Sequence, residues 1–194
     1  MSTQKNKCNL FGVIEARFGW NTFPRQKSFG LISGRFNSNI SIDCDAKAVF
    51  CKKDGTPISK ELDGCCLYFG NEKMFDGAAV HLGDNQIGGS GDDETIKLDL
   101  EKMPPEVDLI ILTLDLFKEK KRVAAGRIQE AFVRIVDSES GKELVRNVIS
   151  NFYSGSKMIV VGRICRSEDG WQLVKDDLAI QVKNMNDFIK AIPM

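Results

Sequence analysis

Short segments of alternating apolar and polar residues, separated by turns rich in glycine, proline and aspartate, recur through most of this 194-residue chain. In residues 40–51 every second residue is apolar, and the residues between them are mostly polar, which is typical of a strand with one buried face. The apolar run at residues 107–117 predicts a central strand that is buried on both faces. Further strands are expected at residues 10–18, 64–69, 95–100, 131–136, 143–149 and 158–166. Asp54–Gly55 predicts a turn within residues 52–57. Many short strands with few helical segments predict an all-β protein, a β-sandwich.

The charge and length of the chain bear on its partners, its number of domains and its location. Lysine plus arginine number 27 and aspartate plus glutamate also number 27, so the net charge is zero and no nucleic-acid partner is expected. The length suits one domain at residues 10–194, preceded by a flexible polar tail at residues 1–9. No apolar run reaches the length of a membrane span, and the tail lacks an apolar signal core. We therefore expect a cytoplasmic protein with no transmembrane segment.

Residues 76–100 form the stretch with the strongest functional signal. Gly83, Asp84 and Asn85 precede a glycine-rich segment at residues 88–91, and three consecutive acids follow it: Asp92, Asp93 and Glu94. Apolar alternation on both sides predicts a strand, an acidic loop and a second strand. Carboxylates crowded into one loop need a cation or full exposure to water, and calcium prefers carboxylate and carbonyl oxygens. The two readings are a calcium site and a solvated acidic turn.

A second pair of acids stands on the strand predicted at residues 40–51. Asp43 and Asp45 share one face of it and lie about 7 Å apart. On an exposed strand they are polar surface. If instead the end of the strand lies beside the acidic loop, the two acids become a second source of oxygen ligands.

Several catalytic and binding motifs do not fit the chain. An EF-hand loop that begins at Asp84 would place its terminal glutamate at Thr95, and neither a Walker A loop nor a nucleophile elbow is present. The single histidine, His81, is expected to have a structural role. No catalytic group is predicted.

The six cysteines lack zinc-ligand spacing, and we expect most of them to be small buried residues. Redox sensing by an exposed Cys8 or Cys66 is the alternative.

The acidic stretch resembles the signature of the TerD family of tellurite-resistance and stress-response proteins. Residues 83–85 match its GDN motif, and residues 91–94 match its GDDE motif. Residues 19–21 resemble the family's GWD, residues 42–46 its FDLDA, and residues 129–136 its NAFIRVV segment. The similarity follows the family's order over nearly the whole chain.

This resemblance implies a calcium-binding, non-enzymatic stress-response protein that works with an unknown protein partner. It implies a β-sandwich with a short C-terminal helix at residues 184–192. The implied ligands of one or two Ca²⁺ ions are Asp84, Asn85, Asp92, Asp93 and Glu94, joined by Asp43 and Asp45.

The chain departs from the family pattern at three places. Its spacer between GDN and GDDE is one residue shorter, and Ser90 stands where many members carry another acid or an asparagine-like ligand. The position of a further acidic segment of the family falls on Leu116–Phe117, with Asp115 just before it. Fewer carboxylates would leave one ion or a weaker site. The alternative function is calcium-dependent binding of membrane phospholipid or another anionic ligand, helped by basic residues at 25–27 or 118–122.

Overall fold

The computed structural model describes residues 9–22, 44–83, 91–115, 128–149, 158–180 and 187. Its strands form two sheets of six strands each, and neighbouring strands pair antiparallel. In order across sheet A the strands are β1 (Asn9–Leu10), β12 (Gly170–Ile180), β11 (Met158–Ser167), β8 (Leu109–Asp115), β3 (Asp45–Cys51) and β4 (Cys66–Leu67). In order across sheet B they are β10 (Glu143–Ile149), β9 (Ile128–Asp137), β2 (Val13–Thr22), β7 (Glu94–Asp99), β6 (Ala79–His81) and β5 (Lys73–Met74).

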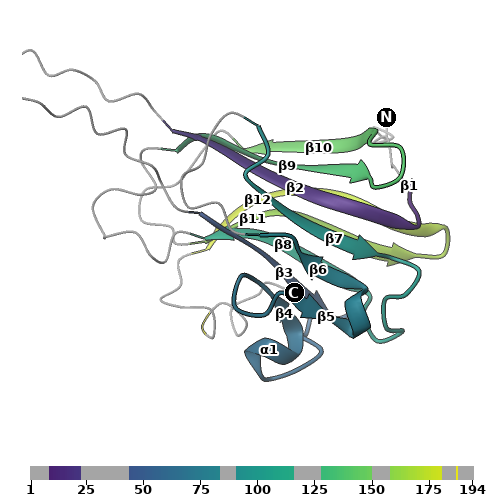
Figure 1. Ribbon diagram of the computed structural model, residues 1–194. Coiled ribbons are helices and arrows are strands. Elements are labelled where there is room, and N and C mark those ends of the chain that lie inside the picture. The colour runs from purple at the N-terminus through teal and green to yellow at the C-terminus, as the bar shows by residue number, and fades with distance from the viewer. Residues whose placement is uncertain are drawn as a thin grey trace, which may run out of the picture.

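The two sheets are stacked as two layers, with the main core between them (Figure 1). Alternation along the strands produces this core, because every second side chain of a strand points to the same face. Ala46, Ala48 and Phe50 of β3 pack into the same cluster as Ala16 and Phe18 of β2. The all-β prediction is confirmed, and the two layers agree with the predicted sandwich.

Strand β8 lies in the middle of sheet A, between β3 and β11, and its side chains from Ile110 to Asp115 are buried. The prediction of a central strand buried on both faces is therefore confirmed. The second face of sheet A, which points away from the main core, carries a smaller apolar cluster that includes Val49, Ile111 and Val160.

The register of the strands brings the functional segments to one end of the molecule. Phe18 on β2 pairs with Glu94 at the start of β7, and Asp45 at the start of β3 pairs with Asp115 at the end of β8. The backbone N–H of Ala46 reaches the side chain of Glu94, so the two sheets meet at this end.

Helix is scarce in the described part of the chain. It consists of the one-turn helix α1 (Leu62–Cys65), the 3₁₀ turn η1 (Phe75–Gly77) and the helical residue Asp187. Apart from Asp187, the predicted C-terminal helix at residues 184–192 lies outside the described residues. The N-terminal tail does so as well up to residue 8, and Asn9 already pairs in β1. Among the described residues, no helix is long and apolar enough to cross a membrane.

The cysteines are mostly interior side chains, as predicted. Cys44, Cys51, Cys65 and Cys66 are buried, and all are free thiols. Burial raises the pKa of Cys51 to about 12 and also raises that of Cys66. The proposal of an exposed, redox-active Cys66 is therefore wrong, because a buried thiol with a raised pKa forms little reactive thiolate. Cys8 lies outside the described residues.

Candidate functional site

Two glycines bring the acidic segment close to strand β2. A Cβ atom on Gly19 would lie 2.2 Å from the carbonyl oxygen of Gly91 and 2.4 Å from the ring of Phe132, so only glycine fits here. Gly91 has a φ of +122°, a conformation that glycine adopts without strain. The backbone N–H of Asp93 then donates to the carbonyl oxygen of Phe18 at 2.6 Å. These contacts fix the backbone from which the three acids project.

The three acids point to three different partners. Asp93 accepts a hydrogen bond from the backbone N–H of Trp20 at 2.9 Å. Trp20 is buried in the main core, so this contact ties the acidic segment to the end of β2.

Glu94 is buried and joins the two sheets. Its Oε2 accepts the backbone N–H of Ala46 on β3 at 2.7 Å and lies 3.4 Å from Nε2 of His81. Nδ1 of His81 accepts the backbone N–H of Gly83 at 3.4 Å, which leaves Nε2 to carry the proton that faces Glu94. His81 thus has the structural role that was predicted for it.

Asp92 lies on the outer face of sheet B between two arginines. Nε of Arg134 donates to its Oδ1 at 2.7 Å, and Nη2 of the same guanidinium contacts Oδ2. Arg17 approaches Oδ2 through Nη1 at 3.4 Å. The hydrogen bonds to Asp92 are the main reason that the pKa of Arg134 is raised above its ordinary value.

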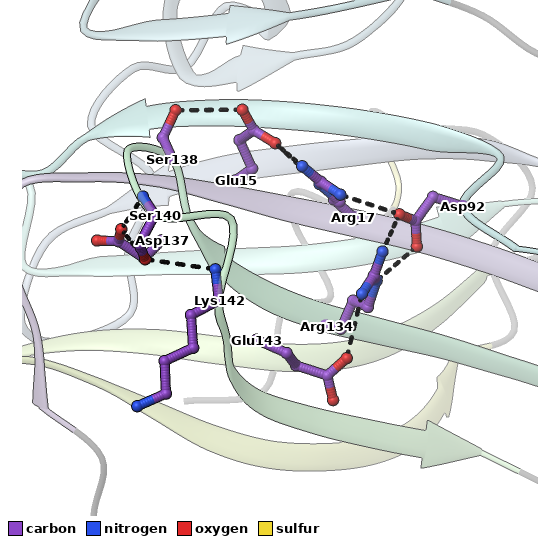
Figure 2. Close-up of polar contacts among 9 residues, drawn as sticks. All are labelled: Glu15, Arg17, Asp92, Arg134, Asp137, Ser138, Ser140, Lys142 and Glu143. Carbon is purple, nitrogen blue, oxygen red and sulfur yellow. Dashed lines mark hydrogen bonds and ion pairs between the residues drawn. The ribbon is translucent and has the colours of Figure 1, made fainter.

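The ion pairs continue across sheet B on both sides of Asp92 (Figure 2). Arg17 donates to Glu15 at 2.8 Å, and Arg134 donates to Glu143 at 3.3 Å. Arg146 donates to both oxygens of Glu143, and its hydrogen bond is the largest cause that lowers the pKa of this carboxyl. We call this row of side chains, from Glu15 through Asp92 to Arg146, the charge ladder of sheet B.

Asp45 lies apart from the ladder. It is buried on the second face of sheet A, where its Oδ2 is 4.0 Å from Nζ of Lys47. Lys47 also contacts Asp115, the cross-strand partner of Asp45. Because successive side chains alternate between the faces of a strand, Asp45 points away from the face on which Ala46 meets Glu94.

A cavity of about 400 Å³ opens beside the acids. Its wall consists of Glu15, Arg17, Leu82, Gly83, Asp92, Asp93, Glu94 and Thr95. Four carboxylates and a single cationic side chain contribute to that wall, which is the donor chemistry that a hard cation prefers.

The described acids fit a cation chemically, but they do not form a complete cage. Among the described residues, no three side chains of histidine, cysteine, aspartate or glutamate converge as metal ligands. The predicted ligands Asp43, Asp84 and Asn85 lie outside the described residues, as do the basic segments at 25–27 and 118–122. Gly83, at the cavity wall, is the residue directly before Asp84.

Sequence reasoning missed the cations that neutralise these acids. Arg17, Arg134 and Lys47 each stand at an outward position of an alternating strand, where they read as ordinary polar surface. Only the register places Arg17 opposite Arg134, and no signal within either segment reveals that pairing.

The family model for the TerD domain matches residues 7–178, which is most of the chain. The chain belongs to the TerD family. Two relatives are named for tellurium resistance and for stress response. Tellurium resistance protein TerZ of Serratia marcescens is 31% identical over 176 residues, with 90% of this chain and 85% of that protein covered. Stress response protein SCP2 of Bacillus subtilis is 33% identical over 134 residues, with 68% of this chain covered and 65% of SCP2, just under two thirds of its length.

A solved structure shares the fold of this TerD chain. The crystal structure of a homologue of telluride resistance protein (TerD) from Streptomyces coelicolor A3(2) superposes with a TM-score of 0.60 at 13% identity. The match covers 90% of this chain and 94% of the other. At this level of identity the likeness concerns the fold alone.

The buried contacts of Glu94 lead to a stability prediction. Replacing Glu94 with alanine leaves the N–H of Ala46 and the Nε2 of His81 without their acceptor inside the protein. We expect Glu94→Ala to lower the free energy of unfolding by about 3 kcal/mol, measured by urea denaturation. Thr95→Ala, at the half-buried neighbour, serves as the matched control and should cost less than about 1 kcal/mol. Equal losses for both variants would contradict the role of Glu94 as a link between the sheets.

Proposed function

We propose that this chain is a calcium-binding, non-enzymatic stress-response protein. The observation that carries the proposal is the cavity beside Gly83, which is walled by the carboxylates of Glu15, Asp92, Asp93 and Glu94. Three of these acids belong to the motif by which the chain resembles other TerD domains. A divalent ion at this place would offset the repulsion between them.

The contacts of the acids separate the predicted ligands into residues that hold the fold and residues that would bind the ion. Glu94 and Asp45 are buried against fixed partners, so they serve the fold first. Asp92 and Asp93 line the cavity from a less buried segment. Asp93 accepts the N–H of Trp20, and a carboxylate has enough lone pairs to accept an N–H and also bind a metal. We therefore centre the proposed site on Asp92 and Asp93, with Asp84 and Asn85 as further ligands.

The names of the relatives support the biological part of the proposal. TerZ is named for tellurium resistance and SCP2 for stress response, and we propose that this chain serves a response of that kind. A cytoplasmic location and a protein partner belong to the same proposal. A binding role rather than a reaction fits His81, whose described contacts are with Gly83 and Glu94 and not with a nucleophile.

Calcium titration of metal-stripped protein tests the proposal. We expect heat of binding by calorimetry and a higher melting temperature. Calcium at about 100 times its dissociation constant should stabilise the fold by about 2.7 kcal/mol, a shift of about 5–10 °C for a chain of this size. The double variant Asp92→Asn/Asp93→Asn should lose both effects.

Asp99→Asn is the matched control, because Asp99 stands at the other end of β7 and pairs with Lys102 at 2.7 Å. This control should bind calcium like the wild type. A wild-type protein that takes up no calcium would end the proposal, and so would a double variant that binds as tightly as the control.

The second candidate function is calcium-dependent binding of anionic phospholipid. The observation that favours it is Leu82, which is 54% exposed and lies on the wall of the acidic cavity. An apolar side chain beside a bound cation would insert between lipid chains while the ion contacts phosphate. We expect sedimentation with phosphatidylserine vesicles only when calcium is present, with a clear loss for Leu82→Ser. Val174→Ser removes an exposed side chain of sheet A and should bind like the wild type. Equal binding with and without calcium would reject this candidate.

A further inference from the structure

Arg17 and Arg134 form a pair of like charges directly across two neighbouring strands. They are register partners on β2 and β9, and both point to the outer face of sheet B, because Ala16, Phe18, Val133 and Ile135 fill the core. Opposed like charges destabilise a sheet unless an anion lies between them. Asp92 is that anion here, and among the described ladder contacts it is the carboxylate that touches both guanidinium groups (Figure 2).

The neighbours of the pair cannot take over this position. Glu15 contacts Arg17, and Glu143 contacts Arg134 and Arg146, so each of these acids lies to one side of the pair. Without Asp92, the space between the two arginines would hold two positive charges and no bridging acceptor. Several N–H groups of the arginines would then point at an empty position.

Asp92 cannot serve the arginines and a divalent ion fully at the same time. Arg134 occupies both of its oxygens, and calcium coordinates the same oxygens at about 2.3–2.6 Å. A guanidinium and a calcium ion at one carboxylate also repel each other. Calcium must therefore compete with Arg134 and Arg17 for Asp92.

The geometry points to an exchange: calcium binding withdraws Asp92 from the arginine pair, and the freed pair of Arg17 and Arg134 then binds a phosphate group in its place. This inference rests on the proposed calcium site centred on Asp92 and Asp93. Phosphate suits the position because paired arginines bind its oxygens with parallel, charge-assisted hydrogen bonds. Of the two arginines, Arg17 lines the cavity of about 400 Å³ together with Asp92, and Arg134 lies outside its wall. The calcium and phosphate affinities are then coupled in the positive direction.

The exchange is tested by calorimetric titration with glycerol 3-phosphate, a soluble phosphate ester. Wild-type protein should bind it about tenfold or more tightly with calcium than without it, because two charge-assisted contacts become available. Asp92→Asn removes the internal anion, so this variant should bind the ester without calcium. The double variant Arg17→Gln/Arg134→Gln should bind it under neither condition. Lys175→Gln, which removes one positive charge from sheet A, should behave as wild type.

A second measurement follows the arginines in the wild-type protein and needs no variant. The Nε–H signal of Arg134 in a ¹H–¹⁵N spectrum should shift when calcium is added. Vesicles that contain phosphatidic acid distinguish the source of the phosphate: binding to vesicles but not to the ester indicates a lipid headgroup, and binding to the ester indicates a free phosphate compound.

The outcomes separate this inference from the proposed function. Calcium uptake with an unmoved Arg134 signal and unchanged phosphate affinity would overturn the exchange and leave the calcium site standing. Failure of Asp92→Asn to bind phosphate in either form would also overturn it. A wild-type protein that takes up no calcium would overturn both.

Discussion

Three consecutive carboxylates, two just before β7 and one at its first residue, lie close together in the chain. Their mutual repulsion must be offset, and the contacts at this end of the molecule do so. Their negative charges are distributed among three partners of different kinds. Glu94 turns inward to a backbone N–H of the other sheet, Asp93 receives the N–H of Trp20, and Asp92 turns outward to two arginines. These contacts offset the repulsion between the adjacent acids, and they also hold β7, β2 and β3 together.

On each sheet, two like charges on neighbouring strands are bridged by one opposite charge, and the signs are reversed between the sheets. On sheet A the acids Asp45 and Asp115 are cross-strand partners and Lys47 bridges them, whereas on sheet B Asp92 bridges two arginines. The two arrangements differ in exposure. Lys47 and Asp115 are buried, and removing one member of a buried pair is costly. Asp92 keeps 20% of its side chain exposed, and partly exposed ion pairs contribute little to stability. The bridge on sheet B is therefore the one that a competing ion can open.

The fold could be predicted from the sequence because its strands depend on local alternation. Residues 45–51 and 109–115 form strands as their apolar patterns predict, and Asp54–Gly55 stands in the predicted turn. The expected strand at residues 64–69 is the exception: residues 62–65 form a helical turn, and only Cys66–Leu67 pairs with β3.

The candidate site could be located from sequence but not assembled. The motif identified Asp92, Asp93 and Glu94 as a group, yet their partners come from β2, β3 and β9, and only the register of two sheets brings those strands to β7. Asp45 illustrates the same limit. Alternation placed Asp45 and Lys47 on the same face of one strand, but it could not show that Asp115 of β8 lies opposite them or that this face is buried.

A crystal structure of the protein grown in excess calcium, with anomalous scattering to identify the ion, tests whether calcium replaces Arg134 at Asp92. We expect calcium beside Gly83, with an oxygen of Asp92 at about 2.3–2.6 Å from the ion and Arg134 separated from that carboxylate. A structure in which Asp92 still holds Arg134, and in which no anomalous peak lies near the acids, would contradict this expectation.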